Sequence, residues 1–143
     1  MAGEKPTRED TWVVTLTVDG IPQGVFDTKT GGEVDSEETK YPPGGMLREI
    51  SLGGRRTIGN ITLTRYCDRV RDWPNIKWLC DRVGAARVSI GQTPLDFAGA
   101  PGGKQLGYTG TLKKCQPPEP DSTGNDASKL ELECTIDGEV TLT

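Results

Sequence analysis

The 143-residue sequence contains no histidine. Ser-His-Asp catalysis, Cys-His catalysis and histidine-ligated metal sites are therefore excluded, because each needs an imidazole. The four cysteines lie at least 13 positions apart and form none of the CxxC pairs that usually build a zinc site. This spacing favours free or buried thiols at Cys67, Cys80, Cys115 and Cys134.

Large apolar side chains are scarce. Leu, Ile, Val and Phe make up 29 residues, whereas Gly and Pro make up 19 and 10. The length suits a single domain over residues 1–143 with a charged N-terminal arm at 1–10. With so few large apolar residues, the core of this domain must be small. We therefore expect contacts with neighbouring subunits to bury further surface. With no long apolar run, neither a signal peptide nor membrane insertion is expected. Synthesis in a reducing cytosol without disulfides follows.

The net charge of −4 is the sum of unlike regions: −5 over residues 1–47, +5 over 48–87 and −4 over 88–143. The basic middle is compatible with nucleic-acid binding or with acidic segments of a neighbouring copy. We favour the second interpretation, because an acidic protein repels phosphate at long range. The basic residues of this region are Arg48, Arg55, Arg56, Arg65, Arg69, Arg71, Lys77, Arg82 and Arg87.

Thr occurs 17 times and Ala only 6 times, which favours strands over helices. A hairpin is predicted from 12–18 and 21–27 around the Asp19-Gly20 turn signal. Further strands are predicted at 61–66, after turn signals at 53–54 and 59–60, and at 86–90, 106–116 and 129–136. The Asp137-Gly138 pair predicts a turn back into 139–142, and loops are expected at 92–105 and 117–127.

One helix is predicted over residues 73–84. Ile76, Leu79, Cys80 and Val83 fall at the i, i+3, i+4 and i+7 spacing of an apolar stripe. Pro74 suits the first turn, Asp72 favours the N-terminal end and Gly84 can cap the C-terminus. We expect the stripe to pack on a sheet.

The stretch 24–41 is extended in character but polar on both faces, and it ends at the Pro42-Pro43-Gly44-Gly45 turn signal. A strand with no apolar face to bury is expected to project from the core. Its acidic residues lack the spacing of a calcium loop and are read as a solvated face rather than as catalytic carboxylates. The Gly-rich stretch 99–104 departs from the phosphate-loop pattern at 98 and 105 and is read as a turn. No enzyme activity and no cofactor are predicted.

The order of these features is specific. A hairpin is followed by VFDTKTGGEVDSEETKYPPGGM (25–46), by LGGRRTIGNITLTR (52–65), by the Trp-containing helix and by the strands of 108–140. This order resembles the major tail tube protein of tailed bacteriophages, which is related to the tube proteins of contractile injection systems. The resemblance covers roughly residues 11 to 142. It implies a mainly β fold, a β-sandwich or partly closed barrel with one flanking α-helix and a long extended hairpin loop.

The resemblance also implies hexameric rings that stack into a tube, assembled in the host cytoplasm and housed in the virion tail. The lumen would hold the tape measure protein and conduct double-stranded DNA without sequence recognition, and tail terminator or tip proteins would be partners. The extended loop at 31–46 would reach the adjacent ring. Its candidate contacts are Gly31, Gly32, Glu33, Asp35, Glu37, Glu38, Lys40, Tyr41, Pro42, Pro43 and Met46, and the candidate inter-subunit charges are Arg48, Arg55, Arg56 and Arg65.

An alternative function remains open at the level of sequence. Trp12, Trp73 and Trp78 could stack single-stranded bases beside the basic middle, as in a single-stranded nucleic-acid-binding β-barrel module. Burial in a core or an interface is the more common use of such residues.

Overall fold

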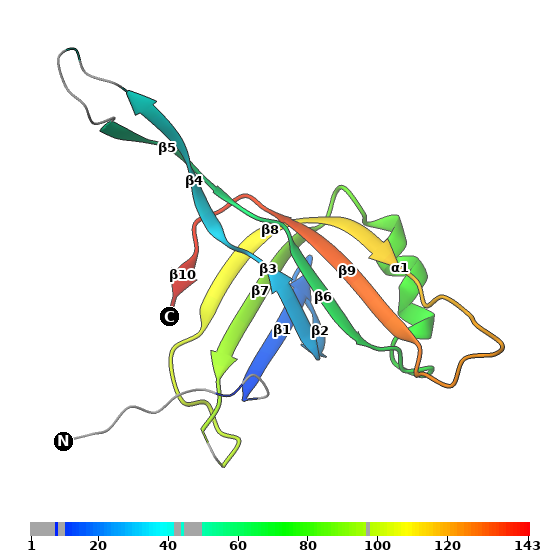
Figure 1. Ribbon diagram of the computed structural model, residues 1–143. Helices are drawn as coiled ribbons and strands as arrows, with labels where there is room; N and C mark the ends of the chain where they lie inside the picture. Colours follow the sequence, from blue (N-terminus) through cyan, green and yellow to red (C-terminus); the bar gives the residue numbers. More distant parts are fainter. Residues whose placement is uncertain (1–7, 9–10, 42–43, 45–49, 97) are drawn as a thin grey trace.

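The chain forms a curled antiparallel sheet with one short helix on its flank (Figure 1). This computed structural model describes residues 8, 11–41, 44, 50–96 and 98–143. No helix among these described residues is long and apolar enough to cross a membrane. The strands are β1 Trp12–Val18, β2 Ile21–Phe26, β3 Thr28–Gly31, β4 Val34–Tyr41, β5 Ile50–Ile58, β6 Ile61–Tyr66, β7 Arg87–Pro94, β8 Leu106–Gln116, β9 Lys129–Ile136 and β10 Thr141–Leu142.

The predicted β1–β2 hairpin is confirmed. Asp19 and Gly20 both have positive φ, at 49° and 80°, which is the geometry of the tight turn that matches the twist of two paired strands. The ladder shifts register between Leu16 and Thr17, opposite the stretch of β2 that contains Pro22 and Gly24. The predicted strands at 61–66, 106–116 and 129–136 form as β6, β8 and β9, whereas β7 runs beyond residue 90 to Pro94.

The main sheet curls until its two end strands approach each other. Its order is β2-β1-β7-β8-β9-β6-β3, so β2 and β3 lie at opposite ends of the path. In the chain, however, only Asp27 separates them, and its amide donates to the Thr64 carbonyl of β6 at 3.0 Å. In a flat sheet, one residue could not join the two strands at opposite ends of the strand order, so the sheet curls into a half barrel. The partly closed barrel expected from the sequence is therefore confirmed.

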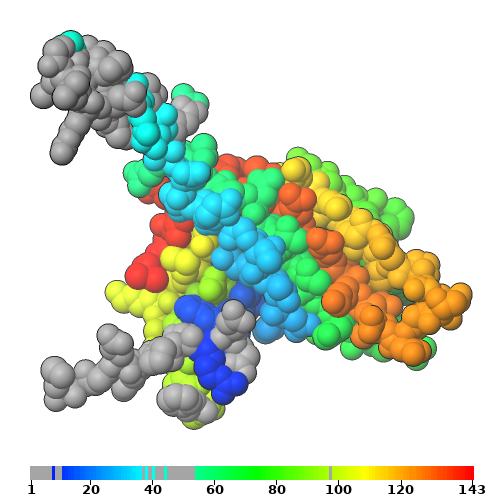
Figure 2. All heavy atoms as spheres, in the orientation of Figure 1, coloured from blue at the N-terminus to red at the C-terminus, as the bar shows by residue number. Residues whose placement is uncertain are grey.

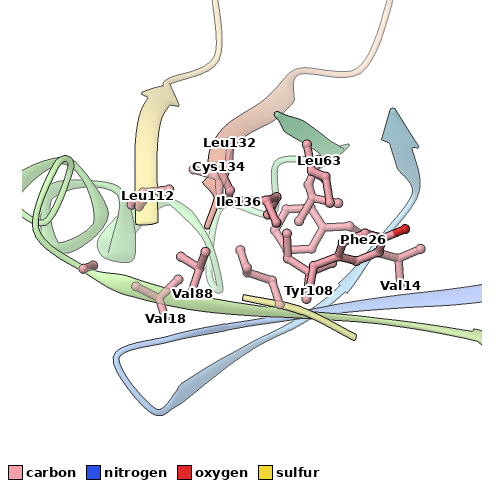
Figure 3. Packing of buried hydrophobic residues seen from close by; sticks show 14 of the residues in the cluster. Val14, Val18, Phe26, Leu63, Val88, Tyr108, Leu112, Leu132, Cys134 and Ile136 are labelled. Atoms are coloured by element: carbon pink, nitrogen blue, oxygen red, sulfur yellow. The ribbon is translucent and has the colours of Figure 1, made fainter. Parts of the chain in front are cut away.

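The core lies on the inner face of the curl (Figure 3). Alternate residues of β1, β7 and β9 point inward, as the period of a half-buried strand requires, and Tyr108 and Leu112 join them from β8. Burial of these side chains is the main favourable term for the fold. The fully buried apolar residues include Leu16, Val18, Ile61, Leu63, Leu79, Leu112, Leu130, Leu132 and Cys134.

The helical segment is shorter than predicted. A 3₁₀ turn at Trp73–Asn75, with Pro74 in its first turn, leads into α1, Ile76–Asp81. The chain then continues as turns to Gly84, whose φ is +89°. Only part of the predicted stripe is buried: Ile76 and Leu79 pack inward, whereas Cys80 and Val83 are exposed. A six-residue helix turns too few residues toward the sheet to bury the whole stripe.

Two other details differ from the prediction. Gly53 and Gly54 do not form a turn, because they lie within β5. The Asp137-Gly138 pair does not reverse the chain either. Ile136 pairs with Gly110 on β8, and after a short detour Thr141 pairs with Gly107 on the same strand in the same antiparallel sense. Strand β10 thus continues the course of β9 along β8.

Candidate assembly surfaces

A two-stranded ribbon, β4 and β5, projects from the half barrel (Figures 1 and 2). Among the described strands, these two pair only with each other, from Val34 with Ile58 at the base to Tyr41 with Ile50 near the tip. Ile58 packs against the core, but Val34 is 52% exposed, so the ribbon is anchored mainly at its base. An isolated hairpin is marginal in water. The ribbon therefore has the form of a segment that gains its full burial from another molecule.

Glycines at the base set the direction in which the ribbon leaves the sheet. Gly31 and Gly32 have φ of +89° and +82°, a conformation that L side chains rarely adopt. A Cβ on Gly31 would lie 1.9 Å from the Asn60 carbonyl oxygen, so this position also requires a residue without a side chain. The Gly59 amide closes the base by donating to the Glu33 carbonyl at 2.9 Å.

The ribbon has an acidic strand and a basic strand. On β4, the side chains of Asp35 and Glu38 are exposed, and on β5, those of Arg55 and Arg56 are exposed. Glu37, Lys40 and Tyr41 lie on β4 as well, so five of the eleven inter-ring candidates share this strand. Glu33 and Lys40 are also exposed, whereas Gly32 is buried at the base. Pro42, Pro43, Met46 and Arg48 lie outside the described residues.

Arg65 does not fit the inter-subunit role expected of it. Its side chain is 3% exposed, and its guanidinium Nη2 lies 2.5 Å from the Asp72 carboxylate of the same chain. Its Nη1 donates to the Gln23 carbonyl of β2, and the guanidinium lies 4.4 Å from the centre of the Phe26 ring. Arg65 on β6 therefore fastens β6 to β2 across the closure of the barrel. A buried, internally paired arginine is unavailable to a neighbour.

The rest of the basic middle is also largely neutralised within the subunit. Arg82 pairs with Asp19 at 3.0 Å, Lys77 with Asp81 at 3.0 Å, and Arg71 with Asp72 at 3.1 Å. Arg87 makes a bidentate contact with Asp137 at 2.5 and 3.0 Å. Hydrogen bonding from Arg87 lowers the pKa of Asp137 and raises that of Arg87. This pairing weakens the case for a continuous nucleic-acid surface, which needs cations free to meet phosphates.

A second exposed surface, which the sequence analysis missed, lies near the helical segment. Tyr66, Val70 and Trp73 are 57%, 83% and 62% exposed. Beside them is a groove of about 550 Å³, lined by Cys67, Arg69, Trp73, Pro118, Pro120 and Ser128. The ribbon leaves the molecule on the side away from α1, so the two surfaces lie far apart (Figure 1). The sequence pattern placed Trp73 at the start of the predicted helix. Its position directly before Pro74 was the one local signal that it lies in a turn.

A curled half barrel with a projecting hairpin and one short flanking helix is a tail-tube-like fold. A chain in the cryo-EM structure of the anti-feeding prophage cap (AFP tube terminating cap) is similar, with a TM-score of 0.77 and 16% identity over 100% of this chain and 94% of that one. A chain in the extended PVC sheath-tube complex of an extracellular contractile injection system gives 0.74 and 18% over 98% and 93%. A chain in the PVC sheath/tube terminator in the extended state gives 0.76 and 17%, with 99% of each chain covered.

At these identities the likeness establishes the fold alone. No protein-family model matches the sequence, and no curated protein sequence matches it either.

Proposed function

We propose that this protein is a structural, non-enzymatic subunit that assembles with copies of itself into the rings of a tube in a tail-like injection apparatus. The β4–β5 ribbon carries the proposal. It is a hairpin that pairs with no other strand in the described part of the chain and extends beyond the half barrel. Such a segment makes physical sense as an arm that completes its contacts on a neighbouring subunit.

The edges of the main sheet support the same proposal. Among the described strands, β2 and β3 end the path and do not pair with each other. The Gln23 carbonyl of β2 accepts a hydrogen bond from Arg65, but neither edge has a strand partner on its outer side. A ring of identical subunits would cover such edges by a repeated head-to-tail contact that closes on itself. The ribbon would then link one ring to the next, and the candidate contacts that lie on it are Asp35, Glu37, Glu38, Lys40 and Tyr41.

The finer form of the proposal is a bacteriophage tail tube with hexameric rings. The order of sequence features supports it, and so does the fold, which is similar to chains in tube, cap and terminator assemblies of contractile injection systems. In this form, the lumen holds a tape measure protein and conducts double-stranded DNA, and terminator and tip proteins close the tube. The net charge of −4 suits a wall that repels phosphate and lets DNA slide.

Electron microscopy of the purified full-length protein, alone and with its neighbouring tail proteins, tests the proposal. We expect rings or stacked rings. A shortened variant in which Asn-Gly replaces residues 39–52 joins the paired positions Glu38 and Gly53 by a tight turn. It should keep its sheet by circular dichroism but lose stacking.

A matched control shortens the 118–127 loop, which lies on the α1 side of the molecule. It should change stacking less than the shortened ribbon does. A wild-type protein that stays monomeric under every assembly condition would contradict the proposal. A shortened ribbon that stacks as well as the wild type would contradict the role given to the arm.

A further inference from the structure

Two cysteines from distant parts of the chain meet beside the helix. Cys80 lies on α1 and Cys115 on β8, two elements that pack against each other, and the Cys80 thiol is close enough to raise the pKa of Cys115. Both cysteines are free. Cys80 is exposed, whereas Cys115 is half-buried against the core. The tube proposed above makes no use of this pair.

A β-bulge aims Cys115 toward the helix. On β9, Leu132 and Cys134 are two residues apart and both point into the core. Their partners on β8 are Cys115 and Leu112, which are three residues apart because the register shifts between Leu112 and Lys114. Without this bulge, the alternation of β8 would turn Lys114 inward. With it, Lys114 is exposed and Cys115 takes the inward position.

The helix is held over this part of β8 from both sides of Cys80. The preceding residue, Leu79, is buried in the core cluster together with Leu112. After the helix, the Gly84 amide donates to the Leu112 carbonyl at 2.7 Å. Cys80 is thus fixed near Cys115 by packing on one side and by a backbone hydrogen bond on the other.

We propose that Cys80 and Cys115 form an intramolecular disulfide when the protein meets a low-molecular-weight disulfide such as oxidised glutathione. The exposed Cys80 thiol loses its proton, and its sulfur attacks one sulfur of glutathione disulfide. That S–S bond breaks, and one glutathione leaves and takes up the proton. Cys115 then loses its proton and attacks the Cys80 sulfur of the mixed disulfide, which releases the second glutathione. The two cysteine thiols lose two electrons, and glutathione disulfide gains them.

The environments of the two thiols set this order. Burial, together with the contact to Cys80, raises the pKa of Cys115 to about 12, so this thiol is a poor nucleophile toward an external oxidant. Once Cys80 carries glutathione, the attack by Cys115 becomes intramolecular, and proximity offsets its high pKa. Cys134 is fully buried in the core, where an oxidant of the size of glutathione cannot reach it.

Mass spectrometry tests the pairing on the full chain. Cleavage after Lys and Arg releases each cysteine on its own peptide: 66–69, 78–82, 115–129 and 130–143. After incubation in glutathione buffers of rising oxidised fraction and alkylation of the remaining thiols, we expect a linked species of 78–82 with 115–129, two hydrogens lighter than the two peptides together. Linkage of Cys80 to Cys67 or Cys134, or four free thiols in the fully oxidised buffer, would overturn the proposal.

Single variants separate the two steps. In Cys115→Ser, the reaction should stop at the mixed disulfide between Cys80 and glutathione. In Cys80→Ser, the intramolecular disulfide cannot form, and Cys115 should react with little glutathione. Cys67→Ser is the matched control and should leave the link unchanged. In the wild type, oxidation should raise the melting temperature, because the link restricts the unfolded chain between 80 and 115. If oxidation raised the melting temperature of Cys80→Ser by the same amount, the rise would not come from the disulfide.

Discussion

The Arg65 guanidinium lies 2.5 Å from the Asp72 carboxylate, and the two side chains are only 3% and 1% exposed. Arg65 extends from β6 to the carbonyl of Gln23 on β2, and Asp72 also accepts hydrogen bonds from the Asp68 amide at 3.0 Å and from the Arg71 side chain. One ion pair therefore joins the closure of the barrel to the turn that leads into the helix.

Removing either partner should destabilise the subunit. Asp72→Asn leaves the Arg65 charge buried without its counter-ion, and Arg65→Met leaves the Asp72 charge with only its remaining donors. Breaking a buried pair in this way costs about 3–5 kcal/mol. Urea unfolding followed by circular dichroism measures the loss for each variant.

The control for this prediction is the surface pair Lys77 and Asp81, whose side chains are 86% and 64% exposed. Asp81→Asn should change the free energy of unfolding by no more than about 0.5 kcal/mol. The double variant Arg65→Met/Asp72→Asn should be less destabilised than the sum of the single variants, because neither charge is then left alone. Strict additivity would show that the two groups stabilise the fold independently.

The same pair predicts a dependence on acid. Burial alone would raise the pKa of Asp72, but hydrogen bonds from Arg71 and the Asp68 amide, with the charges of Arg65 and Arg71, hold this pKa below its ordinary value of 3.8. A group with a lowered pKa in the folded state contributes stability that is fully present well above 3.8 and is lost as the pH falls through the folded-state pKa.

The difference in unfolding free energy between wild type and Asp72→Asn should therefore shrink as the pH falls below 3.8. Urea titrations of both proteins from neutral pH down to the lowest pH at which they fold measure this difference. Other carboxylates, among them Asp68 and Asp137, also have a lowered pKa. They are present in both proteins, so their effect on the unfolding free energy cancels in the difference. A difference that stays constant with pH would mean that Asp72 is not the titrating group.

The strands with one buried face were predictable because their side chains alternate. In β9, Leu130, Leu132, Cys134 and Ile136 are all buried, as the sequence pattern indicated. Strand β5 was missed for the opposite reason. Its residues 54–57 are exposed, and it contains Gly53 and Gly54, which usually mark turns. A strand that is held only by hydrogen bonds to its partner strand has no need of alternating apolar and polar residues, so the usual sequence pattern of a strand is missing.

The candidate assembly surface was predictable in outline only. An acidic stretch with no apolar face indicated a projecting arm. The ion pairs between basic residues and carboxylates far away in the chain could not be predicted from the local sequence. Arg87 and Asp137 are 50 positions apart, and the bulge that turns Cys115 inward depends on the register with β9. Contacts of this kind are set by topology, which periodicity does not encode.

Core truncation should act on the subunit itself rather than on assembly. Leu132 and Leu79 are 0% and 1% exposed, the first in the centre of the sheet and the second on the helix that covers it. Replacing either by Ala should cost about 2–5 kcal/mol, the usual range for a buried leucine. Leu142, which is 62% exposed on β10, is the matched control, and its replacement by Ala should leave thermal unfolding nearly unchanged. A Leu79→Ala variant as stable as this control would show that the helix does not contribute to the core.

The basic strand of the ribbon should act in assembly without acting in folding. Arg55 and Arg56 are exposed on β5, and the described residues of the ribbon pair with no strand of the main sheet. Reversing both charges, as Arg55→Glu/Arg56→Glu, should therefore leave the melting temperature of the isolated subunit unchanged. It should weaken stacking, because attraction to acidic segments of a neighbouring copy becomes repulsion.

Sedimentation and negative-stain microscopy at low and moderate salt measure that effect. In the wild type, added salt should reduce stacking, since exposed charges are screened over about 10 Å at 0.1 M. Lys104→Glu reverses an exposed charge in the loop between β7 and β8, well away from the ribbon, and serves as the control for net charge. If that control weakened stacking as much as the ribbon variant did, the effect would come from overall charge, and the contact assigned to Arg55 and Arg56 would be wrong.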